Sequence, residues 1–125
     1  MYTVAVTRDF IANHKLVGGD WGAENLPHAH HYVAEVSIES MQLDKHGYLV
    51  DITEIEAALG RTVDYFRDCM LNDKPEFAGL NPSIEHFSRI IAEKIRPLIH
   101  PPGTGSLTVK LWENATCWSA FKQAF

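Results

Sequence analysis

The chain of 125 residues lacks the features that mark several large classes of protein. It has only two cysteines, Cys69 and Cys117, which is too few for the disulfide framework of a small secreted domain. No apolar run approaches the roughly 20 residues that a membrane-spanning helix requires. The first ten residues contain Arg8 and Asp9 where a secretory signal would have an apolar segment. We therefore expect a cytoplasmic protein with no membrane partner.

Basic residues are also scarce, because 11 Lys and Arg stand against 16 Asp and Glu and give a net charge of −5. A nucleic-acid-binding surface needs a high density of basic residues to displace the counterions of the phosphates. We therefore expect no nucleic-acid partner. The length suits one domain, and 46% hydrophobic residues suffice for a core without disulfides or structural metals. The prediction is a single domain over residues 1–125.

Apolar and polar residues alternate in several segments, which predicts β-strands. Val36 and Ile38, for example, alternate with Ser37 and Glu39. The segments with this pattern are 2–14, 30–43, a short extension at 48–50, 106–112 and 117–121. Cys117 would lie on the last strand as a small core residue.

Two segments between these strands have helical periodicity instead. In the first, Thr53 and Glu56 have the spacing of a capping box ahead of an apolar stripe that ends at Phe66. The second begins at Asn81-Pro82-Ser83, where Ser83 suits an N-cap and Pro82 lies near the first helical position. Two helices grouped between strands predict an α+β fold, with a four-stranded antiparallel sheet and both helices on one face. The edge strands of such a sheet favour pairing with other subunits, so we expect an oligomer.

Histidine is frequent, with seven residues, and three of them fall within residues 28–31. His28 and His30 are two residues apart on a strand, so their side chains project from the same face, whereas His31 projects from the other. His14, at the end of the preceding strand, could supply a third ligand from an antiparallel neighbour. Such a trio would suit Zn²⁺ with an open fourth position. The alternative is a set of solvated histidines at a strand end.

Six short motifs occur in a fixed order along the chain. They are Phe-x-Ala-x-His-x-Leu at 10–16, His-Ala-His-His-Tyr at 28–32, Gly-x-Leu-x-Asp-Ile at 47–52, Leu-Asn at 71–72, Asn-Pro-Ser-Ile-Glu at 81–85, and Glu113 after an apolar strand. Together they resemble the motifs of the 6-pyruvoyl-tetrahydropterin synthase and 6-carboxy-tetrahydropterin synthase family, the pterin enzymes of the T-fold. The resemblance covers nearly the whole chain.

The resemblance implies a small subunit whose sheet joins those of its neighbours into a barrel, typically in a homohexamer. It implies that His14, His28 and His30 bind zinc and that Glu113 holds a pterin through paired hydrogen bonds. Ser83 and Ile84 occupy positions at which the family's residues can touch the pterin. The implied activity is that of a lyase or synthase acting on a small-molecule pterin.

The chain departs from the family at its catalytic residues. The family has a cysteine in the loop before its histidine pair, where this chain has Glu24. The family's Asp-His pair falls on Arg67 and Asp68, although Asp68 and Cys69 could replace it. One branch of the family also has glutamate at the cysteine position, and it cleaves the side chain of dihydroneopterin triphosphate to give a 6-hydroxymethyl pterin. In that case Glu24 would be the acid–base residue.

These departures give three functional hypotheses. In the first, the chain is a pterin-pocket enzyme that binds and acts on a dihydropterin-like substrate but does not catalyse the pyruvoyl synthase reaction. In the second, it is a non-catalytic homologue that binds a pterin-like ligand without metal. In the third, it is a structural oligomer whose cleft is unused.

Overall fold

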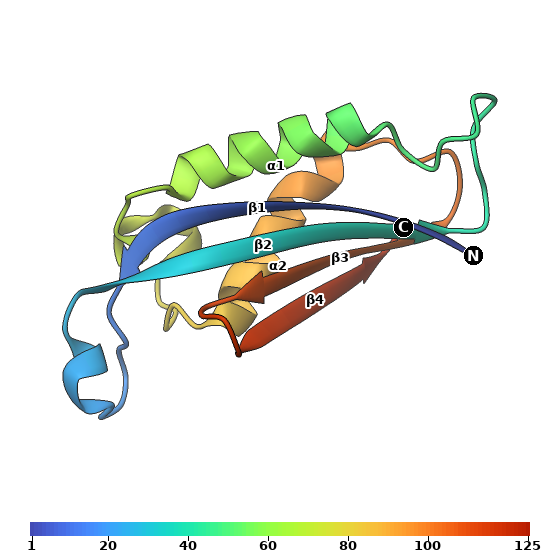
Figure 1. Ribbon diagram of the computed structural model, residues 1–125. Coiled ribbons are helices and arrows are strands. Elements are labelled where there is room, and N and C mark those ends of the chain that lie inside the picture. Colours follow the sequence, from blue (N-terminus) through green and yellow to red (C-terminus); the bar gives the residue numbers. More distant parts are fainter.

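The computed structural model describes all of residues 1–125 and is built around one antiparallel sheet of four strands (Figure 1). Each strand pairs with the next one along the chain, so the order across the sheet is β1-β2-β3-β4 and the edges are β1 and β4. The strands are β1 (Tyr2–His14), β2 (His28–Ser40), β3 (Gly105–Trp112) and β4 (Trp118–Ala124).

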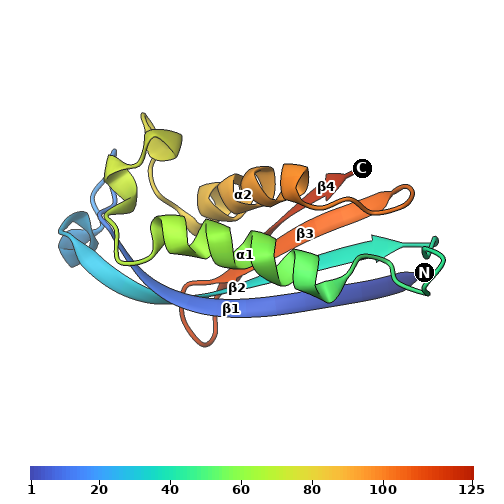
Figure 2. The ribbon, with the colours of Figure 1, turned by 90° about the horizontal axis from the view of Figure 1, so that it is seen from above.

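Two helices cover a single face of this sheet. The view from above shows α1 (Ile52–Phe66) and α2 (Ile84–Ile95) on the same side of the strands (Figure 2). Four 3-10 turns complete the chain: η1 (Gly22–Asn25), η2 (Leu71–Asp73), η3 (Pro75–Phe77) and η4 (Arg96–Leu98). The predicted α+β class, with a four-stranded antiparallel sheet and both helices on one face, is confirmed. No helix is both long and apolar enough to cross a bilayer.

The core lies between the sheet and the helices, and strand alternation decides which side chains enter it. On β2, Tyr32, Ala34, Val36 and Ile38 are fully buried, while the residues between them are only half-buried. An aromatic cluster extends this core toward the end of β1, where the ring of Phe87 lies 5.1–5.9 Å from those of four neighbours. The neighbours are Phe10, Tyr32, Phe66 and Phe77.

Both helices begin at a side-chain cap, but the cap of α1 differs from the prediction. The Asp51 carboxylate accepts hydrogen bonds from the backbone N–H and the hydroxyl of Thr53, at 2.9 and 2.8 Å. The N-cap is therefore Asp51 and not Thr53. On α2 the hydroxyl oxygen of Ser83 accepts from the backbone N–H of His86, as expected, and Pro82 lies one residue before the cap.

Two other local predictions are wrong. Residues 48–50 form no strand, because the Asp44 carboxylate takes the backbone N–H groups of His46 and Tyr48 in a turn. Cys117 precedes β4 and is exposed, since it belongs to the β3–β4 turn, in which Asn114 accepts its backbone N–H.

Candidate metal and ligand site

The three predicted imidazoles meet at one end of the sheet, where β1 finishes and β2 starts. In the strand register, His14 faces His28 and Ala12 faces His30. This pairing places the three rings on the helix-covered face, with centroids 4.5–4.9 Å apart. His31 projects from the opposite face, where its Nε2 lies 2.7 Å from Asp9 Oδ2.

Backbone carbonyl groups fix the tautomers of two of these rings. His14 Nδ1 lies 3.0 Å from the carbonyl oxygen of Pro82, and His28 Nδ1 lies 2.8 Å from that of Leu26. Since a carbonyl can only accept, each Nδ1 carries the proton and each Nε2 of a neutral ring presents a lone pair. The two Nε2 atoms are 2.9 Å apart. Two lone pairs at that distance repel each other unless a proton or a metal ion lies between them. Partners that orient the ring through its other nitrogen are usual for metal-binding histidines.

The donor set fits a zinc ion. One ligand atom from each of His14, His28 and His30 lies within 4.8 Å of the others. Zinc binds imidazole nitrogen at about 2.0–2.1 Å, so two ligands of a tetrahedral ion lie about 3.3 Å apart. Burial lowers the pKa of His14 to about 4, an effect reinforced by His28 and His30 and opposed by the Pro82 carbonyl and Glu24. His14 is therefore neutral at pH 7, the form that binds metal.

Glu113 approaches the same imidazoles from the end of β3. Its Oε1 lies 3.0 Å from His30 Nε2 and 3.8 Å from His14 Nε2, and its side chain is 27% exposed. Its backbone N–H donates to the carbonyl of Cys117 across the β3–β4 turn. This hydrogen bond fixes the position of the Glu113 backbone, from which the side chain projects. The structure thus brings together the three histidines and Glu113, which lie far apart in the sequence.

Tyr32 is a member of this site that the sequence analysis did not single out. Its hydroxyl group lies 3.4 Å from His14 Nδ1, and the side chain is completely buried. Burial and the charge of Glu113 raise the pKa of the Tyr32 phenol, so it stays protonated. Strand alternation could have found it, because Tyr32 follows His28 and His30 at the same spacing of two residues.

A hollow of about 620 Å³ adjoins this cluster. His30 and Glu113 form the wall that the hollow shares with the histidine trio, and Trp112 and His31 line it from the sheet face opposite the helices. A cavity of this size can hold a bicyclic heterocycle, within the usual range for small-ligand pockets. The remaining lining residues are Thr7, Ala29, Val33, Asn114 and Ala115.

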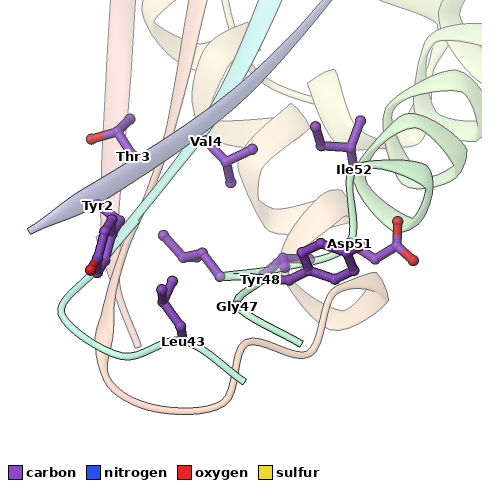
Figure 3. Close-up of a pocket in the computed structure, with 10 residues that line it drawn as sticks. Tyr2, Thr3, Val4, Leu43, Gly47, Tyr48, Asp51 and Ile52 are labelled. Atoms are coloured by element: carbon purple, nitrogen blue, oxygen red, sulfur yellow. The ribbon is translucent and has the colours of Figure 1, made fainter. Parts of the chain in front are cut away.

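A second hollow, of about 380 Å³, lies at the other end of β1 (Figure 3). The close-up shows Tyr2, Leu43, Tyr48 and Ile52 around it, together with Asp51. The Asp51 carboxylate is already engaged as the cap of α1, and no imidazole lines the cavity. The motif at 47–52 therefore lies at the opposite end of β1 from the histidines, and the one carboxylate of this hollow caps α1.

The other predicted site residues do not line the 620 Å³ hollow. Glu24 is exposed on η1, which projects beyond the sheet at the end of β1 and β2 (Figure 1), and its charge acts on His14. Ser83 caps α2 and Ile84 packs against the core.

The residues at the family's Asp-His position form their interactions with groups outside the histidine trio. Arg67 is exposed and pairs with Asp64 at 3.6 Å. Asp68 is exposed with a positive φ of 58°, and its backbone N–H donates to Ile11. The thiol of Cys69 donates to the carbonyl of Tyr65. None of these three side chains forms an ion pair or hydrogen bond with the histidine trio or Glu113.

Comparison with known proteins decides the family. A family model described as 6-pyruvoyl tetrahydropterin synthase matches residues 3–124. The chain belongs to this family. A search of the curated proteins found no match.

Solved structures of 6-pyruvoyl tetrahydropterin synthases have the same fold. The Caenorhabditis elegans enzyme superposes with a TM-score of 0.82 at 20% identity, over 98% of this chain and 95% of that one. The Plasmodium falciparum enzyme gives 0.74 at 11% identity, over 98% and 99%. A Plasmodium vivax synthase, solved with a catalytic glutamate replaced by cysteine, gives 0.77 at 10% identity over the whole of both chains.

Proposed function

We propose that this member of the 6-pyruvoyl tetrahydropterin synthase family binds a dihydropterin-like ligand and acts on its side chain with zinc. The observation that carries the proposal is that Glu113 and His30 form a common wall between the histidine trio and a hollow of about 620 Å³. The 2-amino group and ring N–H of a pterin donate in parallel, which matches the two oxygens of a carboxylate. A pterin held by Glu113 in this hollow would have its side chain beside the trio.

His14, His28 and His30 would hold the zinc ion. When bound, zinc would act as a Lewis acid on an oxygen of the ligand's side chain. The protein's own contribution is orientation: the carbonyl groups of Pro82 and Leu26 hold two of the rings with Nε2 toward the site. Burial keeps His14 in its neutral form.

Glu24 would be the residue that moves the proton. Its backbone carbonyl accepts from Leu16 N–H, which brings η1 back against the end of β1, and its charge acts on His14. The Plasmodium vivax relatives, in which a glutamate is named as the catalytic residue, support a carboxylate in this role. With glutamate in place of the family's cysteine, we propose cleavage of the bond between the first and second side-chain carbons. This gives a 6-hydroxymethyl pterin and a two-carbon aldehyde that carries the triphosphate, and not the pyruvoyl product.

The pocket would be completed by other copies of the chain. β1 and β4 are free edges, so neighbouring sheets can pair into a barrel, and a homohexamer is the proposed assembly. Ser83 and Ile84, which do not line the hollow of their own chain, would then contact the ligand of a neighbour.

A non-catalytic ligand-binding protein is the second candidate. The observation that favours it is that Arg67 pairs with Asp64 at the surface and that the side chain of Asp68 forms no ion pair with the histidines. In this alternative the family's Asp-His pair has no replacement. In this case the ligand is held by Glu113 but is not converted.

Ligand binding is tested by the quenching of neopterin fluorescence. We expect quenching by the wild-type protein, its loss in Glu113→Ala, and no change in Glu56→Ala, which removes an exposed carboxylate on α1. Unchanged quenching in Glu113→Ala would refute the pocket assignment.

Turnover is tested with dihydroneopterin triphosphate, with and without added zinc. Zinc-dependent formation of a 6-hydroxymethyl pterin that is lost in Glu24→Gln is the expected result. Binding without any product would establish the non-catalytic alternative, and undiminished turnover in Glu24→Gln would exclude that residue as the base.

A further inference from the structure

We propose that the Glu113 carboxylate is a fourth protein ligand of the metal in the ligand-free protein, and that it leaves the metal to bind the N–H edge of the incoming heterocycle. The first part concerns this chain's metal site alone, whereas the second rests on the proposed function. Glu113 would then bind first the metal and later the heterocycle. Ligand binding would thereby free a coordination position on the metal.

The distances between the side chains favour shared ligation. Glu113 Oε1 lies 3.0 Å from His30 Nε2 and 3.8 Å from His14 Nε2. Two ligands of one tetrahedral zinc ion are about 3.3 Å apart. The carboxylate oxygen therefore lies at the separation expected of a further ligand beside the imidazole nitrogens.

The orientation of the His30 ring favours metal ligation over an ordinary ion pair between His30 and Glu113. His30 Nε2 is buried and makes no hydrogen bond, although Glu113 Oε1 lies only 3.0 Å away. An imidazolium–carboxylate pair aligns its N–H with the oxygen. Two such pairs in this chain are aligned, His31 with Asp9 at 2.7 Å and His100 with Glu54 at 2.8 Å. Two ligand atoms of one metal ion lie close together but point toward the metal and not toward each other. His30 Nε2 and Glu113 Oε1 have this relation.

Charge gives a physical reason for the ligation. Three neutral imidazoles leave both charges of a Zn²⁺ ion uncompensated in a half-buried site, and removing charge from water is costly. A carboxylate ligand halves the net charge. Glu113 is the one carboxylate that forms ion-pair contacts with the trio, whereas Glu24 acts on His14 only through its charge.

Glu113 is also free to change partners. Its backbone is held by the hydrogen bond to Cys117, but its carboxylate forms ion-pair contacts with His14 and His30 alone and accepts no hydrogen bond. The same side chain lines the 620 Å³ hollow. Rotation about the side-chain bonds can therefore carry the carboxylate from the histidines to the hollow without moving the sheet.

The test uses the full-length protein loaded with Co²⁺, whose visible absorption reports coordination geometry, together with competition for Zn²⁺ by a chelator. Three proteins are compared: wild type, Glu113→Gln, and Glu24→Gln as a matched loss of one nearby charge. We expect Glu113→Gln to change the Co²⁺ spectrum and to weaken zinc binding by at least about tenfold, the lower end of what even an outer partner of a ligand contributes. Glu24→Gln should keep the wild-type spectrum. Identical spectra and zinc affinities in wild type and Glu113→Gln would overturn the proposal.

Adding neopterin to the Co²⁺ protein tests the exchange of partners. The wild-type spectrum should shift toward that of Glu113→Gln. One outcome would be a Co²⁺ spectrum that depends on Glu113, with neopterin neither shifting that spectrum nor losing its own fluorescence. Metal ligation by Glu113 would then stand, and the proposed function would fail. If neopterin is quenched by wild type while the free-protein spectrum is independent of Glu113, the pterin pocket stands and this inference is overturned.

Discussion

Acidification from pH 7.5 to pH 5 should destabilise the metal-free protein through the buried ring of His14. The folded protein holds this ring neutral because it is almost completely buried, which lowers its pKa from 6.5 to about 4. In the unfolded chain the same ring takes up a proton near pH 6.5. Between these values the unfolded state binds more protons, so stability is fully present above pH 6.5 and is lost as the pH falls toward 4.

The size of this effect follows from the shift. A fall of the pKa from 6.5 to about 4 corresponds to about 3 kcal/mol over the whole window, of which about 2 kcal/mol is lost by pH 5. The assay is urea unfolding of chelator-treated protein at pH 7.5 and pH 5, followed by circular dichroism. His14→Asn should lose about 2 kcal/mol less on acidification than wild type. The exposed His46, replaced by Asn, is the matched control and should behave as wild type. An equal loss in His14→Asn and wild type would refute the reasoning.

Two further predictions concern stability and are measured by the same unfolding assay at pH 7.5. Asp51→Ala removes the cap of α1 and should cost about 1 kcal/mol, whereas Asp51→Asn, which keeps an acceptor oxygen, should cost much less; equal losses would contradict the capping role. Phe87→Ala removes the ring at the centre of the aromatic cluster and should cost about 3–5 kcal/mol. A loss below 1 kcal/mol would show that the cluster does not pack as described.

Most of the fold could be predicted because the two periodicities are strong. Strand alternation placed the buried residues of β2, and the helical stripes placed the buried faces of α1 and α2. The start of α1 was missed because Asp51 and Thr53 are both good capping residues, and the hydrogen bonds between them decide the choice. The segment at 48–50 was missed because a side chain, that of Asp44, takes the N–H groups that a strand would need.

The candidate site was only partly predictable. Spacing alone paired His28 with His30, and His14 followed from an antiparallel neighbour. Glu113 was suggested by the family resemblance and by its place after an apolar strand, but its contact with His30 was not predictable. The two residues are 83 positions apart, and the β2–β3 register brings them together. The carbonyl groups of Pro82 and Leu26 that orient the histidine rings could not be predicted, because they belong to the backbone and do not depend on residue type.

Metal content is the most direct test that His14, His28 and His30 form a zinc site. The protein is purified without chelator and analysed for zinc, alongside His28→Ala and the matched control His31→Ala, which removes the histidine on the opposite face. We expect about one zinc per chain in wild type and His31→Ala, and almost none in His28→Ala, which lacks one of the three imidazole ligands. A wild-type protein that holds no zinc even after incubation with the metal, or a His28→Ala variant that holds as much as wild type, would contradict the assignment.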